Sequence, residues 1–326
     1  MKQMNVIYAA NENYAKLVWI SASSLFENNK DYTIKLYLIS DNILPDSIQK
    51  IDQLVRRHGN KLVVIDFSEI SYGLENAQIF SGSKTTYARL FLPDIIPEEK
   101  ILYLDCDTLI MDSLNELWCI NMEDYYVAGV QDMVVPHIRY DIDLDHTAPY
   151  LNAGILLMNI KKMKSDGLQE KFIDYIKVMN GAVPCHDQGV INHVCKGGIN
   201  VITPEYNVMT PMFYYSANEI KSFYELEDYY TNHDIEVACE KPKIIHFTAG
   251  WYVRPWFVGS KHPYAKIYKN YYLQSPWGAI PMQKGTIHKK IQLMKLLYKI
   301  LPFALFVTIA KWKRKYRGKV SNGKTN

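Results

Sequence analysis

This chain of 326 residues lacks several short signatures that would identify a cofactor site or a metal-binding module. No G-x-G-x-x-G follows the first predicted strand and no G-x-x-x-x-G-K-[ST] occurs, so neither a dinucleotide-binding fold nor a P-loop is supported. Cysteines are few and odd in number, and no two form a C-x-x-C pair. We therefore expect no disulfide framework and no zinc ribbon, and a reducing compartment fits better. The five cysteines are Cys106, Cys119, Cys185, Cys195 and Cys239.

Long hydrophobic runs are also missing. The N-terminal stretch MKQMNVIYAANENY is interrupted by Asn and Glu, so we expect no signal peptide. The apolar run Ile300 to Ala310 is too short to cross a bilayer. No internal repeat or low-complexity segment is present, and a content of 48% hydrophobic and 22% charged residues is that of an ordinary globular protein. One large domain with an appendage fits this length.

Acidic residues are absent from the C-terminal segment 284–326. Twelve of the 37 Lys and Arg residues lie there, which leaves 25 basic and 34 acidic residues in the rest of the chain. An acidic body with a basic tail predicts two parts, a domain of residues 1–283 and a tail of residues 284–326. A uniformly basic nucleic-acid-binding protein is not indicated, and we expect no nucleic-acid partner.

Apolar segments rich in β-branched and aromatic residues alternate with helical patterns. Helices are expected over Tyr14 to Glu27, from Pro45 to about His58, and over TTYARLFLPDII, where Pro93 should end the helix. The order predicts an α/β fold with a mainly parallel sheet flanked by helices. The strand candidates are NVIYAA, KLYLIS, LVVIDF, KILYLD, YYVAGVQD, YLNAGILLMNI, INVITPEY and KPKIIHF.

Polar residues stand at the ends of the predicted strands, where open sheets of this kind bind their ligands. These strand-end residues are Asn11, Asp41, Asp66 and Asp105.

Two carboxylates, Asp105 and Asp107, stand one residue apart after the apolar run KILYL. Like charges so close repel, so either a cation or solvent should separate them. Oxygen ligands suit Mg²⁺ or Mn²⁺, ions that complete their coordination with substrate phosphates. A solvated turn is the alternative, because D-x-D also occurs at Asp141 and Asp143. Haloacid dehalogenase-type phosphatases carry D-x-D-x-[TV]; here Thr108 comes one position early, which disfavours that class.

Six segments in order resemble glycosyltransferase family 8, with the layout of its bacterial lipopolysaccharide galactosyl- and glucosyltransferases. The resemblance implies a GT-A (Rossmann-like) fold, a UDP-sugar donor, Mn²⁺, and transfer with retention of anomeric configuration. From about residue 5 to about residue 256, the segments are NVIYAANENYAKLVWISASSLFENN, TTYARLFLP, ILYLDCDTLI, LNAGILLMNI, HDQGVIN and HFTAGWYVRPW.

The resemblance also implies roles for single residues. Asp105, Asp107 and His246 correspond to the metal ligands, for Mn²⁺ or Mg²⁺. Asp187 and Gln188 correspond to the catalytic pair; Asp187 would bind sugar hydroxyls, and the Gln188 carboxamide would stabilise positive charge at the anomeric carbon. The implied donor-binding positions are Ala10, Asn11, Asn13, Tyr14, Arg89, Asp105, Cys106, Asn152, Ala153, Asp187, Gln188, Gly250 and Arg254.

Structural explanations remain open at these positions. Asn11 suits a helix cap, Arg89 a surface salt bridge, and Gly154 a β-bulge. Asp187 with its neighbour suits a surface turn, and a histidine such as His246 after an apolar strand is commonly structural.

Two positions depart from the family pattern. Gly189 stands where the family usually has the second Asp of D-Q-D, which removes one candidate carboxylate nucleophile. This favours front-side attack over double displacement. Arg254 stands where the family has Lys before Pro-Trp, after a longer loop from His246. Arginine would still bind the β-phosphate, with two hydrogen bonds where the geometry permits.

The tail shows a helical pattern from Ile287 to Leu301, which Pro302 should break. The basic cluster Lys311 to Lys319 follows, and a basic segment with apolar flanks fits a helix lying in an anionic membrane surface. A terminal helix pair packed on the main domain is the alternative. The polar face of the first helix would hold His288, Gln292, Lys295 and Lys299.

We therefore expect a retaining hexosyltransferase that moves galactose or glucose from a UDP-sugar to a saccharide, glycolipid or glycoprotein acceptor. It would be cytoplasmic, with the tail on the cytoplasmic face of the membrane. A sugar nucleotidyltransferase is one alternative, but AANENY lacks the Gly-rich loop with Arg that such enzymes need. A non-catalytic glycan- or nucleotide-binding scaffold is another, and it would bind donor without turnover. Variable loops, around 131–150 and 208–228, would hold the acceptor.

Overall fold

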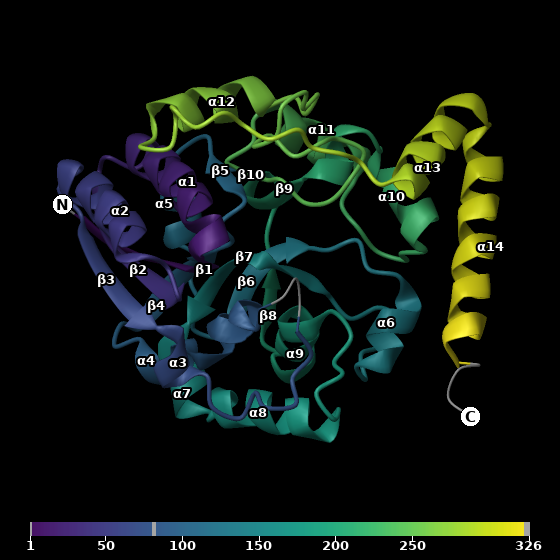
Figure 1. Cartoon of the computed structure of the whole chain (residues 1–326). Coiled ribbons are helices and arrows are strands. Elements are labelled where there is room, and N and C mark those ends of the chain that lie inside the picture. The colour runs from purple at the N-terminus through teal and green to yellow at the C-terminus, as the bar shows by residue number, and fades with distance from the viewer. Residues whose placement is uncertain (1, 80–82, 323–326) are drawn as a thin grey trace.

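The computed structural model describes residues 2–79 and 83–322, with side chains up to residue 314. A central sheet has helices on both faces, and a pair of C-terminal helices lies at one side of the molecule (Figure 1).

The central sheet contains seven strands in the order β3-β2-β1-β4-β7-β6-β8. The pairs β1–β2, β2–β3, β1–β4 and β6–β8 are parallel, whereas β7 runs antiparallel to both of its neighbours. The predicted mixed, mainly parallel α/β sheet is thereby confirmed. Its strands are β1 (Lys2–Asn11), β2 (Tyr32–Asp41), β3 (Lys61–Asp66), β4 (Lys100–Leu104), β6 (Val127–Gln131), β7 (Leu151–Asn159) and β8 (Ile199–Val201).

A second, small sheet has the order β5-β10-β9, with bounds β5 (Thr108–Ile110), β10 (Ile244–His246) and β9 (Val208–Met209). In its register His246 is opposite Thr108. This pairing brings a histidine late in the chain next to the carboxylates that precede β5.

The helices fall largely where the sequence pattern puts them. The expected helix ending at Pro93 is different: a 3-10 helix, η2 (Thr85–Phe91), runs directly into α4, and Pro93 sits in the first turn of α4. The helical segment therefore ends near Pro93 as predicted, at Ile95, but Pro93 does not end it, because a proline in the first turn needs no backbone N–H. The remaining short 3-10 helices are η1 (Glu12–Tyr14), η3 (Pro204–Asn207) and η4 (Thr210–Phe213).

The α-helices are α1 (Ala15–Asn28), α2 (Pro45–Arg57), α3 (Phe67–Ile70), α4 (Leu92–Ile95), α5 (Asn115–Trp118), α6 (Pro136–Asp141), α7 (Ile160–Ser165), α8 (Leu168–Val178), α9 (His186–Val194), α10 (Ala217–Tyr224), α11 (Asn232–Glu240), α12 (Ala265–Gln274), α13 (Lys289–Ile300) and α14 (Phe303–Asn322).

Two hydrophobic cores cover the two faces of the sheet. Alternation along β4 divides its side chains between them: Leu102 and Leu104 face the core under α1 and α2, and Ile101 and Tyr103 face the core under α8 and α9. Both faces are buried, as the continuous apolar run of β4 predicts. The carboxyl ends of β1 and β4 therefore emerge at one edge between two packed layers.

The tail forms α13 and α14, with Pro302 between them as predicted. Both helices contact the main domain: Phe306 is fully buried, and the Tyr298 hydroxyl donates to the Tyr214 carbonyl (3.0 Å). The polar face expected on α13 does not lie wholly in solvent, because Lys295 Nζ donates to the Trp251 carbonyl (3.0 Å). In the predicted basic cluster, the side chains from residue 315 on lie outside the described residues.

Large apolar side chains of the tail point away from the domain. Their exposed fractions are 49% for Leu293, 52% for Leu296, 66% for Ile300, 48% for Leu305 and 61% for Trp312. Within residues 2–79 and 83–322, no helix combines the length and hydrophobicity needed to cross a membrane.

Candidate active site

The D-x-D turn after β4 is held by hydrogen bonds. The Asp105 N–H donates to the Gly154 carbonyl of β7 (2.7 Å). The Thr108 hydroxyl donates to the Asp105 carbonyl (2.8 Å) and contacts Ser21 of α1 (2.7 Å). The turn is thereby fixed between α1 and the central sheet, so the direction of both carboxylates is set by the fold.

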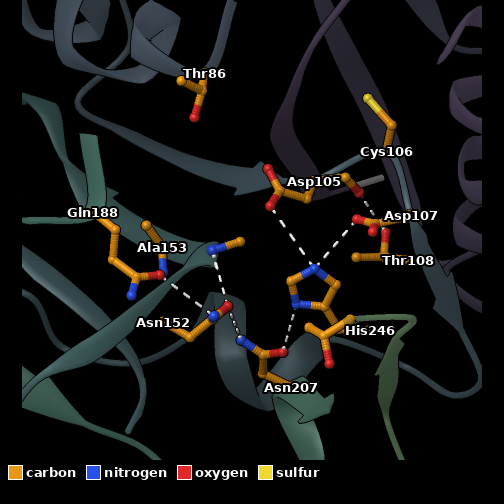
Figure 2. Close-up of polar contacts among 12 residues, drawn as sticks. Thr86, Asp105, Cys106, Asp107, Thr108, Asn152, Ala153, Gln188, Asn207 and His246 are labelled. Carbon is orange, nitrogen blue, oxygen red and sulfur yellow. Dashed lines mark hydrogen bonds and ion pairs between the residues drawn. The ribbon is translucent and has the colours of Figure 1, made fainter. Parts of the chain in front are cut away.

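Asp105, Asp107 and His246 converge on one point. Ligand atoms from the three residues all lie within 4.8 Å of one another. His246 Nε2 lies 3.2 Å from Asp107 Oδ1 and 3.8 Å from Asp105 Oδ2 (Figure 2). Gly154 leaves the room for this arrangement, because a Cβ there would lie 2.3 Å from His246 Cε1. The sequence prediction that these three side chains meet agrees with the geometry.

The His246 ring is oriented by a buried amide. Its Nδ1 lies 3.1 Å from Asn207 Oδ1, so Nδ1–H donates there and Nε2 is left to face the carboxylates. Burial alone would lower the pKa of His246, but Asp107 and Asp105 outweigh burial and raise it. Two carboxylates and an imidazole are a donor set that fits Mn²⁺ or Mg²⁺.

The two carboxylates have opposite pKa shifts. Burial raises the pKa of Asp105, and its neighbour Asp107 raises it further. Burial alone would also raise the pKa of Asp107, but His246 and Arg254 outweigh burial and lower it. The protein's own cations therefore outweigh burial at Asp107 but not at Asp105, and a bound divalent cation would favour the charged form of both.

Arg89 joins the D-x-D turn to the start of α9. The side chain is buried; Nη2 donates to Asp105 Oδ1 (2.9 Å) and Nε pairs with Asp187 Oδ2 (2.9 Å). Nη1 donates to the Ala153 carbonyl, and the guanidinium lies 4.1 Å from the centroid of the Tyr103 ring. The surface salt bridge considered for Arg89 is excluded by this burial.

The backbone at the start of α9 is strained. Cys185 and His186 both adopt left-handed φ values, 58° and 54°. Such a conformation costs roughly 1 kcal/mol or more for a residue other than glycine. It turns the chain so that Asp187 and Gln188 stand in the first turn of α9, with Asp187 buried and accepting a hydrogen bond from the Thr86 hydroxyl.

Gln188 is fixed at both ends of its amide. Its Oε1 accepts from the Ala153 N–H (3.0 Å), and its Nε2 donates to Asp132 Oδ2 (2.8 Å) and to the Tyr150 hydroxyl (3.3 Å). Asp132 Oδ2 also accepts from Asn152 Nδ2 (3.1 Å). The orientation of the carboxamide is therefore determined by the protein.

A chain of amides connects His246, a candidate metal ligand, to Gln188. Asn207 Nδ2 donates to Asn152 Oδ1 (2.9 Å), and Asn152 Nδ2 donates to Gln188 Oε1 (3.4 Å). Together with the Asn207–His246 contact, this forms one network across the site (Figure 2).

A cavity of about 240 Å³ opens beside the D-x-D turn, and we call it the donor cavity. Asn13 does not line it; Asn13 is exposed, and its N–H donates to the Asn11 side chain (3.1 Å). Five other predicted donor-binding residues are not part of its wall: Asn152, Ala153, Asp187, Gln188 and Gly250. Of the predicted donor-binding residues, its wall contains Ala10, Asn11, Tyr14, Arg89, Asp105, Cys106 and Arg254.

The other strand-end carboxylates do not line the donor cavity. Asp41 accepts hydrogen bonds from Ser83 (2.7 Å) and Thr85 (2.5 Å), which do line it. Asp66 caps α3 through Ser68. Asp41 thus supports the cavity wall, and Asp66 has a local structural contact.

Arg254 reaches the D-x-D turn from the loop after β10. Its Nη1 donates to Asp107 Oδ2 (2.7 Å). In the same loop, a Cβ at Gly250 would lie 2.7 Å from Thr210 Cγ2 and 2.9 Å from the Tyr214 hydroxyl, so the loop packs closely there. The long loop therefore brings the Arg254 guanidinium to Asp107, one of the candidate metal ligands.

Gly189 leaves no space for the missing carboxylate. A Cβ at this position would lie 2.0 Å from the Pro184 carbonyl oxygen and 3.0 Å from Val183 Cγ1. An Asp here would require the turn before α9 to move. The local packing around Gly189 therefore excludes the second Asp of D-Q-D.

Sequence reasoning missed three residues of the site: Asp132, Asn207 and Thr86. A signal existed for Asp132, which ends the predicted strand YYVAGVQD just as Asp105 follows KILYL. Asn207 likewise directly follows the predicted strand INVITPEY, whereas Thr86 has no such signal. Only the fold brings Asn207 to His246 and Thr86 to Asp187.

Comparisons with known proteins point to one family. A family model described as Glycosyl transferase family 8 matches residues 5–258. General stress protein A of Bacillus subtilis (strain 168) is 27% identical over 285 residues, which cover 85% of this chain and 96% of that protein. A lipopolysaccharide 1,2-glucosyltransferase of Escherichia coli is 28% identical over 293 residues, covering 86% of this chain and 81% of that protein.

A solved structure supports the fold. The crystal structure of the galactosyltransferase LgtC in complex with donor and acceptor sugar analogues matches with a TM-score of 0.67 and 21% identity, over 89% of this chain and 99% of that one. At this identity the likeness concerns the fold, and it confirms the GT-A architecture expected from the sequence.

Proposed function

This chain belongs to glycosyl transferase family 8, and from that membership we propose a retaining hexosyltransferase that uses a UDP-sugar. Galactose or glucose would pass to a glycan or cell-envelope acceptor. The observation that carries the proposal is the convergence of Asp105, Asp107 and His246 beside the donor cavity.

Asp105, Asp107 and His246 would hold Mn²⁺, or Mg²⁺, under the donor diphosphate. The ion would neutralise the charge that develops on the departing diphosphate. Arg254, already paired with Asp107, would bind the β-phosphate and cover the site. Ala10, Asn11 and Tyr14 would receive the uracil and ribose at the other end of the cavity.

Asp187 would accept hydrogen bonds from sugar hydroxyls, since Arg89 and Thr86 hold it in place. Gln188 would present its amide oxygen to the positive charge at C1, in the orientation that Asp132 and Ala153 impose. With glycine at the second Asp position of D-Q-D, we infer front-side attack. The acceptor oxygen bonds to C1 on the face from which the diphosphate departs, and the hydroxyl proton passes to the departing phosphate oxygen.

Donor turnover tests this proposal. Hydrolysis and transfer with UDP-glucose and UDP-galactose should require Mn²⁺, stop with EDTA, and fall at least about 100-fold in Asp107→Ala. Asp141→Ala, in the exposed second D-x-D, is the matched control and should leave both rates unchanged. Turnover that ignores EDTA and survives Asp107→Ala would refute the metal-dependent reaction, and donor binding without any turnover would instead indicate a scaffold.

For the tail we propose attachment to the cytoplasmic face of the membrane. The outward Leu296, Ile300 and Trp312 side chains support this, together with the excess of basic residues. Binding to vesicles with anionic lipid should exceed binding to neutral vesicles, weaken in high salt, and fall in Ile300→Glu. Val178→Glu removes an equally exposed apolar residue of α8 and should change nothing. Equal binding of both variants would contradict this role of the tail.

A further inference from the structure

A second cavity lies across the loop from the donor cavity. Its volume is about 460 Å³, and it shares no lining residue with the donor cavity. The loop after β10 separates the two: Arg254 lines the donor cavity, whereas Ala249, Gly250 and Trp251 line the second. We call this second space the aromatic cavity. α10, α13 and α14 enclose its other sides, at the right of Figure 1.

The walls of the aromatic cavity are stacked rings. Tyr214 and Trp251 stack with centroids 4.0 Å apart at an interplanar angle of 13°. Phe223 of α10 and Phe306 of α14 stack at 5.5 Å and 11°, so the tail helix is part of the wall. A cavity of this size and lining suits an apolar ligand segment or the apolar face of a sugar.

The rim of the aromatic cavity is cationic. Lys290 of α13, Lys313 and Arg314 of α14 all contribute to its lining. Glu225 lies 3.8 Å from Arg314, but neither lysine takes part in an ion pair with any side chain the structure describes. Two ammonium groups beside an apolar space are complementary to a phosphate attached to an apolar group.

The loop after β10 connects the aromatic cavity to the catalytic end of the site. Gly250 lines the cavity, and a Cβ there would lie 2.9 Å from the Tyr214 hydroxyl, so the loop packs against the ring wall. Further along the same loop, Arg254 Nη1 donates to Asp107 Oδ2 (2.7 Å). The aromatic cavity thus adjoins the loop that also reaches the D-x-D turn.

We propose that the aromatic cavity is the acceptor subsite and that its occupant is a glycolipid phosphate, an inference that rests on the proposed glycosyltransfer. The phosphate lies on Lys290 and Lys313, the apolar stem lies among the rings, and the saccharide faces the loop after β10. A lipid-linked acceptor is favoured over a soluble sugar phosphate because α13 and α14, which close the cavity, also carry the outward apolar side chains of the tail.

Binding of a synthetic probe to the full chain tests the subsite. Dodecyl phosphoryl glucose, below its micelle concentration, should bind in calorimetry. Dodecyl glucoside lacks the phosphate and glucose 1-phosphate lacks the lipid, and each should bind at least about tenfold more weakly. Equal binding of dodecyl glucoside overturns the phosphate assignment, and equal binding of glucose 1-phosphate overturns the lipid-linked assignment.

Charge reversal at the rim is the matched test. Lys290→Glu and Lys313→Glu should each weaken probe binding about tenfold or more, because each removes a charge-assisted contact. Lys299→Glu makes the same change on the exposed side of α13, away from the cavity, and should bind like the unmodified chain. If the rim variants bind like Lys299→Glu, the subsite is wrong.

A filling variant tests the space itself. Met294→Trp adds bulk to the cavity wall and should abolish probe binding, with thermal unfolding used to establish that the variant is folded. Retained binding in the folded variant contradicts the proposal. UDP-sugar hydrolysis without acceptor should be unchanged in the rim variants. A failure of hydrolysis in the unmodified chain overturns the proposed function, whereas loss of probe selectivity with hydrolysis intact overturns the subsite alone.

Discussion

Replacing Gly154 by alanine should weaken Mn²⁺ binding while the protein remains folded. The new Cβ would lie 2.3 Å from His246 Cε1 and 2.8 Å from Asp105 Oδ2, where ordinary contact begins at 3.4 Å. The imidazole must therefore move by about 1 Å, far more than the roughly 0.2 Å that a metal ligand tolerates. Since a misplacement of this size costs about 100-fold in reactions that need exact geometry, we expect Mn²⁺ affinity to fall by about that factor.

Gly129→Ala is the matched control for Gly154→Ala. Its Cβ would lie 2.9 Å from Leu156 Cδ2 and 3.2 Å from Leu151 Cδ1, so it overpacks the same sheet without touching a metal ligand. Both variants should lose about 1–3 kcal/mol of unfolding free energy. Titration with Mn²⁺, monitored by the electron paramagnetic resonance signal of the free ion, should show weakened binding in Gly154→Ala and unchanged binding in Gly129→Ala.

Two results would contradict the prediction for Gly154→Ala. If Gly154→Ala binds Mn²⁺ as tightly as the unmodified chain while remaining folded, then Asp105 and His246 are not joint ligands of one ion. A parallel loss of affinity in Gly129→Ala would also refute the reasoning, because it would trace the effect to the sheet and not to the ligands.

Three further changes have defined outcomes. Asp132→Ala removes the carboxylate that accepts from Gln188 Nε2, so kcat should fall about 10–100-fold with KM little changed. Asp132→Asn keeps an oxygen that can accept this hydrogen bond and should restore part of kcat. Gly189→Asp should lose about 1–3 kcal/mol of unfolding free energy in denaturant titration and gain no transferase rate, because a backbone oxygen occupies the space. Burial raises the pKa of Glu98, but hydrogen bonds from Lys35 and Tyr37 outweigh it and lower that pKa. Unfolding free energies measured across pH should therefore exceed those of Glu98→Gln at pH 7. The difference should shrink as pH falls below the ordinary glutamate pKa of about 4.3 and vanish below the lowered pKa of the folded state.

Much of the fold was readable from the sequence because its periodicities are strong. Strands such as β4 are continuous apolar runs, and α2 begins at a proline that fixes its first turn. The segment INVITPEY was harder: only β8 is a strand, and Pro204 then starts η3. Local composition could not reveal where the strand ends, because the length of a strand depends on the neighbouring strand with which it pairs.

For the site, Asp105 and Asp107 could be found from the strand they follow, whereas Asp132 and Asn207 were missed, because contacts with other elements define their roles. Asp105 and Asp107 were evident because KILYL aims them at the sheet edge. Asn207 lies outside all six segments that resemble the family, and only the β9–β10 pairing brings it to His246. The outward apolar face of α13 was also unreadable, because helical projection does not say which face a neighbour covers.

The amide network between His246 and Gln188 has a thermodynamic consequence. Ordering either end restricts Asn207 and Asn152, so a ligand bound at one end lowers the entropy lost on binding at the other. Ion and sugar should then bind with positive coupling, and by reciprocity each raises the affinity of the other by the same factor. Such a protein would release its ion readily between turnovers and retain it firmly whenever a hexose is present.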